Sequence, residues 1–250
     1  SVGINGTVQD GSSTGDVNTW VYLSGTMNGS TVTLYKNGGV IGTPVAASGN
    51  LGAETSHVCI AAGANDATRN CTTELVNAII DEVHISNAAR SADWVEAEHL
   101  FTKDSTKYTY GAEEAGGWWD TTWQHRRKVT FNNAASAENL ANFPVMLALS
   151  ASNIDYGKTK NSGEDIRFVD ADGTTQLAHE IEKWDEAGTS IVWVKVPQID
   201  AASTTDYIWM YYNNTGAADG QQATSVWDSN YKGVWHMKES PDGTSGEIKD

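Results

Sequence analysis

The sequence has little cysteine and no long apolar run, and each shortage excludes a class of protein. Only two cysteines, Cys59 and Cys71, occur among the 250 residues, and no cysteines and histidines cluster at the spacing of a zinc site. A Gly/Asn-rich stretch separates the two cysteines, so we predict a hairpin-closing disulfide, with two free thiols as the alternative. No apolar stretch approaches the roughly 18 residues that cross a bilayer, so no membrane insertion is predicted.

Basic residues are half as numerous as acidic ones. The chain carries 16 Lys and Arg against 32 Asp and Glu, a formal net charge of −16. This charge repels phosphate backbones and anionic lipids, so nucleic acids and membrane surfaces are poor partners, whereas cations and neutral glycans remain open. An acidic surface rich in Gly, Asn and Thr suits an extracellular or cell-surface protein. Because the sequence opens inside a strand-like pattern without an initiator Met, we interpret its N-terminus as a cut end.

Catalytic motifs are also missing. The sequence has no serine nucleophile elbow, phosphate-binding loop or Cys/His dyad. Glu180 and Glu182 would lie about 7 Å apart on one strand face, a pairing that a glycosidase could use. Any polar strand face satisfies this spacing, so we expect both carboxylates on a solvated face. The six histidines are scattered singly, His84 is expected to face solvent, and none is predicted to bind metal. The sequence therefore predicts a protein that is not an enzyme.

Alternating apolar and polar residues fill the first part of the chain. Residues 19–26, 31–36 and 40–46 form an antiparallel meander in this interpretation, because Asn-Gly pairs suited to tight hairpin turns separate them. Further strands are predicted at 57–62 and 78–86. The period then becomes helical over 87–100, with Ser91 as the N-cap, and we expect this helix to lie over one edge of the sheet.

A second alternating pattern follows a Gly/Glu-rich stretch, residues 111–117, which is predicted to be a linker. Short turns separate six predicted strands, so this part is expected to be another sandwich. The segment from Asp170 to Gly173 begins like a calcium loop but lacks the later ligands, so it is interpreted as a hairpin turn. The predicted fold class is all-β, with two antiparallel β-sandwich (jelly-roll-like) modules joined by a short linker, the first one incomplete. The six strands are 124–131, 143–149, 165–170, 175–183, 190–197 and 206–212.

Three segments resemble the closing half of a laminin G/concanavalin A-like lectin domain. They are Trp20-Val-Tyr-Leu23, Leu34-Tyr-Lys-Asn-Gly38 and the stretch from Ile80 to Trp94. In the last, a strand is followed by Ala-Arg-Ser and a tryptophan, as in that family. The family's opening strands are absent, so residues 1–110 are expected to be the C-terminal part of such a sandwich. The resemblance also implies that calcium is a possible cofactor, with Asn65 and Asp66 as candidate ligands; no other cofactor is predicted.

The rest of the chain resembles two further modules. Residues 118–225 are similar to an uncharacterised domain of the DUF2341 type, which is often found beside laminin G-like modules in large surface proteins. Residues 226–250 resemble the first strand of another laminin G-like domain. The segments that carry the first resemblance are Trp123-Gln-His-Arg-Arg-Lys128, Phe143-Pro-Val145, Asp165-Ile-Arg-Phe168, Asp172-Gly173, Trp193-Val-Lys-Val-Pro197 and Tyr211-Tyr212.

A ligand surface is predicted on aromatic residues of the second sandwich. Trp193, Trp209 and Tyr211 would form an aromatic platform if their strands were adjacent, and flat rings of this kind stack on sugars. In the alternative, the rings are buried under Trp118, Trp119 or the linker.

Two function classes fit these features. The first is a cell-surface or secreted adhesion or scaffold module, with carbohydrate binding as its more specific form and glycans or neighbouring surface-protein modules as partners. The second is a self-associating structural subunit of an extracellular filament or sheath, assembled by strand exchange between neighbouring half-domains. Fold analogy alone does not choose between them.

Overall fold

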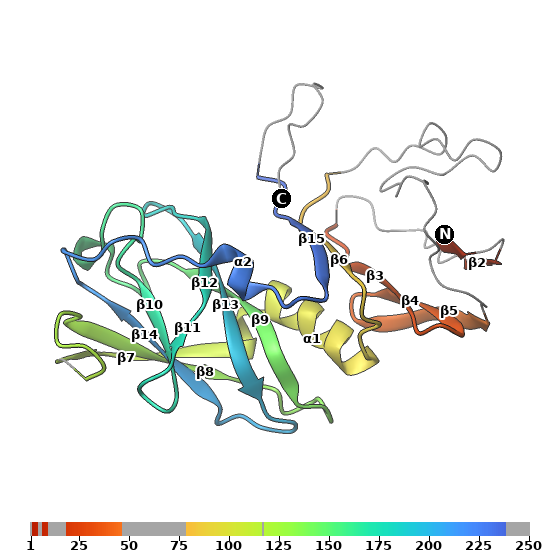
Figure 1. Cartoon of the computed structure of the whole chain (residues 1–250), viewed down its shortest axis with the longest axis horizontal. Helices are drawn as coiled ribbons and strands as arrows, with labels where there is room; N and C mark the ends of the chain where they lie inside the picture. Colours follow the sequence, from red (N-terminus) through yellow and green to blue (C-terminus); the bar gives the residue numbers. More distant parts are fainter. Residues whose placement is uncertain (1, 5–6, 10–18, 47–78, 117, 239–250) are drawn as a thin grey trace.

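The computed structural model describes residues 2–4, 7–9, 19–46, 79–116 and 118–238 (Figure 1). Within these ranges the sheets are antiparallel and the two α-helices are short, which confirms the all-β prediction. Several predictions lie outside the described residues: the disulfide between Cys59 and Cys71, the calcium ligands Asn65 and Asp66, and the strand at 57–62.

The first unit, by which we mean the described residues up to position 86, contains the predicted meander. Strands β3 (Leu23–Met27), β4 (Thr31–Lys36) and β5 (Gly39–Ala46) form a three-stranded sheet in that order. Between β4 and β5, Asn37 and Gly38 have φ angles of +52° and +81°, the left-handed conformation that a two-residue hairpin requires. A separate hairpin joins β1 (Val2–Ile4) and β2 (Thr7–Gln9).

The second unit is a sandwich of two sheets. One has the order β11-β10-β14-β8-β7 and the other β12-β13-β9. The six predicted strands are confirmed, with one of them divided between β11 and β12. The bounds of the first sheet, in sheet order, are Gln176–Leu177, Arg167–Asp170, Tyr207–Tyr212, His125–Phe131 and Tyr108–Ala115. Those of the second are His179–Lys183, Ser190–Ile199 and Leu140–Leu149, and short 3-10 helices span Ser105–Lys107 and Tyr156–Lys158.

The core of the sandwich lies between these two sheets. Alternate residues of each strand point inward, as the two-residue period of a strand requires. Phe143, Val145 and Leu147 of β9 meet Ile208 and Met210 of β14 in one buried apolar cluster. Gly173, at φ +74°, closes the turn between β10 and β11, and Asp172 Oδ1 accepts hydrogen bonds from the backbone N–H groups of residues 174 and 175. The interpretation of this segment as a hairpin turn is confirmed.

The predicted linker is mostly strand. Residues 111–115 belong to β7, which pairs with β8 from Tyr108 opposite Phe131 to Ala115 opposite His125. The glutamates of this segment suggested a solvated connection, but they bind the neighbouring strand. Glu114 forms an ion pair with Arg126 at 2.8 Å, so charge pairing across the sheet stabilises a strand of low hydrophobicity.

Helix α1 (Ala92–Lys103) is where predicted, but it packs mainly on the second unit. Ser91 Oγ accepts a hydrogen bond from the N–H of Trp94 at 3.0 Å, which confirms the N-cap. The ring of Trp94 meets Phe143 edge-on, 4.9 Å between centroids, and Phe101 meets Phe143 at 5.5 Å. On the other side, Tyr22 of the first unit donates to Glu98. The helix therefore lies between the two units and completes the second core (Figure 1).

The C-terminal segment returns to the first unit. After the short helix α2 (Ala223–Val226), strand β15 (Tyr231–Trp235) pairs antiparallel with β6 (Val83–Ser86) of the same chain (Figure 1). Val83 lies opposite Trp235, and His84 lies opposite Val234. The strand that resembled the start of another domain thus contacts the last described strand of the first one.

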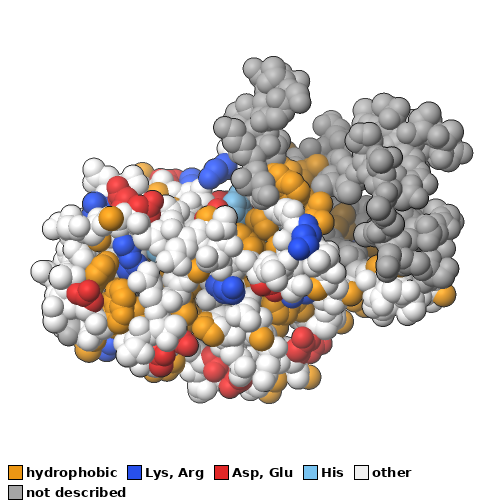
Figure 2. Space-filling model, in the orientation of Figure 1, with side chains coloured by type: hydrophobic (Ala, Val, Ile, Leu, Met, Phe, Trp, Pro, Cys, Tyr) orange, Lys and Arg blue, Asp and Glu red, His pale blue; other side chains and the backbone are white. Residues whose placement is uncertain are grey.

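Positive charge is dispersed on one face of the molecule. On the face shown in Figure 2, the described Lys and Arg side chains are scattered singly among acidic, apolar and uncharged ones. No helix among the described residues is long and apolar enough to cross a bilayer.

Candidate functional site

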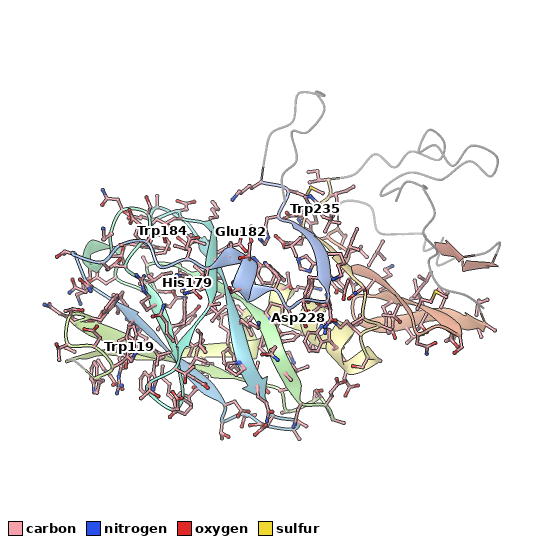
Figure 3. The ribbon with its side chains drawn as sticks, in the orientation of Figure 1. Trp119, His179, Glu182, Trp184, Asp228 and Trp235 are labelled. Carbon is pink, nitrogen blue, oxygen red and sulfur yellow. The ribbon has the colours of Figure 1, made fainter. Side chains whose placement is uncertain are left out.

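A buried polar and aromatic cluster forms where β12, β15 and the start of β6 meet; we call it the junction cluster. Its members are Glu82, His84, Glu180, Glu182, Trp193, Trp227, Tyr231 and His236. In Figure 3, Glu182 lies at the edge of the large sandwich that faces β15, whereas His179 lies inside the sandwich. The two side chains diverge because residues an odd number of positions apart on a strand point to opposite faces, and His179 and Glu182 are three positions apart on β12.

Strands β12 and β13 supply the first wall of the cluster. Glu180 lies opposite Trp193 in the sheet register, so both side chains emerge on the outer face. Trp193 Nε1 donates to Glu182 Oε2 at 2.8 Å. The side chains of Glu180 and Glu182 are only 18% and 14% exposed. Our expectation of a solvated strand face is wrong, because a segment about 50 residues further along the chain covers it.

That covering segment runs from α2 through β15. Trp227, directly after α2, places its ring 5.1 Å from that of Trp193 and donates from Nε1 to Glu180 Oε2 at 3.1 Å. His236, directly after β15, stacks on Trp193 with centroids 5.7 Å apart and is 8% exposed. An open groove of about 570 Å³ lies beside these residues, and Glu180, Trp227 and His236 line it together with Asp228 and Tyr231.

The third wall comes from the first unit. His236 Nδ1 lies 3.0 Å from each carboxylate oxygen of Glu82. His84 Nε2 lies 3.2 Å from Glu82 Oε2, and its ring is 4.9 Å from that of Trp227. The expectation that His84 faces solvent is wrong, because β15 and Trp227 enclose its ring.

The charges of the cluster are coupled. Burial alone lowers the pKa of His236, but its contacts with Glu180 and Glu82 raise it to about 10. Burial likewise opposes ionisation of Glu82 and Glu180, yet their bonds to His236 bring the pKa of each below its usual value. Burial and the charge of Glu82 raise the pKa of Glu182 to about 7. The cluster thus holds one cation among more carboxylates than it can neutralise.

A second candidate region is the outer face of the five-stranded sheet, which we call the outer aromatic face. The Arg126 guanidinium lies 3.7 Å from the ring centroid of Trp118 and 3.6 Å from that of Trp209. Lys128 Nζ lies 3.8 Å from the ring of Tyr207, which in turn meets Trp209 edge-on. Trp118 is 42% exposed, so aromatic rings and cations alternate on a partly open surface.

The predicted platform of Trp193, Trp209 and Tyr211 is not formed. Trp193 belongs to β13 and the other two to β14, and these strands lie in different sheets. Tyr211 is fully buried, with Trp119 over it at 5.7 Å between ring centroids. Only Trp209 is partly exposed, so it is the one predicted residue that reaches the outer aromatic face.

Sequence reasoning missed the junction cluster for a geometric reason. Its glutamates and histidines come from three segments, with 154 positions between Glu82 and His236. No local spacing relates residues so far apart, and the signal lay only in the pairing of β6 with β15.

Two family models match parts of the chain. Residues 2–96 match the concanavalin A-like lectin/glucanases superfamily, and residues 162–237 match a domain of unknown function, DUF2341. Both recognised families are therefore found, although the second match begins later than the predicted module and includes β15. Neither match shows a further laminin G-like domain at the end of the chain. No curated protein matches the chain. No solved structure matches it either.

Proposed function

We propose that this chain is a non-catalytic adhesion or scaffold module of an extracellular protein, in which the two β-rich units are held in a fixed orientation. The observation that carries the proposal is the β6–β15 ladder with the junction cluster beside it. Main-chain hydrogen bonds and the ring contacts of Trp227 join the units. A flexible linker would let them reorient, whereas a paired strand and a packed cluster set one geometry.

Replacement of Trp227 by alanine tests this role of the junction. We expect the backbone amides of residues 83–86 and 231–235 to exchange with deuterium about 10-fold faster, because the ring that joins β6, β13 and β15 is lost. Exchange in β9 and β14 should stay as in the wild type. Trp184→Ala is the matched control, since Trp184 packs on Tyr156 instead. Unchanged exchange at β6 and β15 in the Trp227 variant would contradict a joining role.

Carbohydrate binding is the more specific part of the proposal, and the outer aromatic face is its site. Partly exposed rings of Trp118, Trp209 and Tyr207 offer apolar surfaces for the C–H groups of a sugar. Arg126 and Lys128 lie over one face of these rings, and together with Glu114 they can exchange hydrogen bonds with the hydroxyl groups of a sugar at the edge of this stack.

A glycan array on the full chain gives the direct test of this surface. We expect Trp209→Ala to weaken binding to the glycans that the wild type retains by about 10-fold or more, as the loss of a stacked aromatic anchor does. Trp20→Ala is the control, because Trp20 is 64% exposed but lies in the first unit. Binding that falls equally in both variants, or in neither, would place the ligand elsewhere.

The alternative function, a subunit of an extracellular filament, also rests on the pairing of β6 with β15. The β6–β15 sheet has two strands, and a neighbouring chain could supply β15 in place of the chain's own strand. Light scattering and electron microscopy of the full chain separate the two functions. A monomer at every concentration supports the scaffold module, whereas concentration-dependent filaments with β15 ordered against a neighbour's β6 support the structural subunit.

A further inference from the structure

We propose that His236 Nδ1 and the carboxylates of Glu82 and Glu182 form a binding site for a first-row divalent metal ion, with Zn²⁺ as the best match. The three ligand atoms lie within 4.8 Å of one another. They come from the segment before β6, from β12 and from the residue after β15, so one ion would connect both units and the returning strand. This inference does not depend on glycan binding or on adhesion.

The separations of the ligand atoms suit a metal ion. Nδ1 of His236 is 3.0 Å from both oxygens of Glu82 and 3.6 Å from Glu182 Oε2. Nitrogen and oxygen ligands bind Zn²⁺ at about 2.0–2.2 Å, which places neighbouring ligand atoms of a tetrahedron about 3.4 Å apart. The separations of 3.0 and 3.6 Å from His236 Nδ1 lie on either side of that value, so small side-chain rotations would bring each carboxylate to coordinating distance beside Nδ1.

Both carboxylate ligands contact a second group that can orient them, as in built metal sites. Trp193 Nε1 donates to Glu182, and His84 lies at hydrogen-bond distance from Glu82. The third ligand, His236, is nine-tenths buried, and its Nε2 atom has no hydrogen-bond partner. Glu180 Oε1 lies 3.5 Å from that atom. Metal-bound histidines usually direct their other ring nitrogen to a carboxylate, and Glu180 is in place to receive it.

The charge and the ligand types select the class of ion. Glu82, Glu180 and Glu182, with Asp81 near them, face His236 and the more distant Lys238. His236 must release its proton to bind a metal, so a divalent ion in place of that proton adds one positive charge to this arrangement. An imidazole nitrogen with two carboxylates suits Zn²⁺ or Mn²⁺, whereas Ca²⁺ takes six to eight oxygen ligands. The site therefore differs in chemistry from a calcium site.

Titration of the full chain with ZnCl₂ at pH 7, after removal of metals with EDTA, tests the proposal. An alkylating agent first blocks any free thiol at Cys59 and Cys71, so that sulfur cannot hold the ion. We expect one ion per chain by calorimetry and a rise in the melting temperature. Glu82→Gln and Glu182→Gln, which keep the shape of each side chain, should each weaken the affinity by about 10-fold or more. Glu114→Gln is the control, because Glu114 pairs with Arg126 elsewhere.

Co²⁺ provides a second measurement that needs no thermal transition. Bound at this site, it should show visible ligand-field absorption without the strong charge-transfer bands of sulfur ligands. Absence of stoichiometric binding, or an affinity unchanged in both glutamate variants, overturns the proposal. An equal loss in the Glu114 variant overturns it too, since that result indicates general attraction to an acidic protein.

Discussion

Replacing Trp94 with alanine is expected to lower the free energy of unfolding of the second sandwich by about 3–5 kcal/mol. Trp94 is 5% exposed and belongs to the same apolar cluster as the residues between the two sheets. Its ring packs on Phe143, and Arg90 lies 4.2 Å above it. The cavity would therefore open in the core of the second unit. Trp94 itself falls within residues 2–96, which match the concanavalin A-like lectin/glucanases superfamily.

Chemical denaturation followed by tryptophan fluorescence measures this loss. The matched control is Trp20→Ala, which removes a ring that is 64% exposed and should change stability by less than about 0.5 kcal/mol. Proteolysis then locates the effect, since β9 and β13 should become cleavable in the Trp94 variant. A loss confined to the strands of the first unit would show that α1 does not complete the second core.

Acid is expected to destabilise the second sandwich through His179. This side chain is 1% exposed, its two ring nitrogens have no hydrogen-bond partners, and it meets Phe168 edge-on. Burial, helped by the charge of Arg167, lowers the pKa of His179 from 6.5 to about 4. The unfolded chain therefore binds a proton at a higher pH than the folded one. The free energy of unfolding is therefore unaffected by His179 above pH 6.5 and decreases as the pH falls toward 4, by about 3 kcal/mol in total.

His179→Leu provides the comparison for this pH effect. Leucine cannot be protonated and leaves no unsatisfied ring nitrogen, so the variant should be as stable as the wild type at pH 7 or more so. Unfolding free energies measured at pH 7 and pH 4.5 should differ less in the variant than in the wild type. Equal acid sensitivity in the two proteins would mean that His179 is not the group that titrates.

Local signals in the sequence predicted most of the strands correctly. The Asn-Gly turn at residues 37–38 and the alternation along β9 and β13 are properties of neighbouring residues, and the structure confirms both. The N-cap at Ser91 is another local signal. The same reasoning failed where contacts between segments far apart in the sequence determine the local structure. Residues 111–115 have the composition of a linker but form a strand because β8 lies beside them.

The candidate sites show the same limit. Trp193 was correctly placed on a strand face, but which sheet that strand joins depends on pairing across the whole domain. Glu180 and Glu182 carry no local mark of burial, because the residues that cover them follow about 50 positions later. His236 acquired its partners only through the return of β15 to β6.

The β6–β15 ladder also determines how the molecule would respond to tension along its chain. The chain enters β6 at Val83 and leaves β15 at Trp235, and these two residues are paired at the same end of the ladder. A force pulling the two flanking segments apart would therefore open the ladder one pair at a time, starting there, as a zipper opens. The large sandwich lies between the two strands in sequence. Once the contacts of His236 with Glu180 and Trp193 had broken, it would therefore bear no further load until the last pair, Ser86 with Tyr231, had separated.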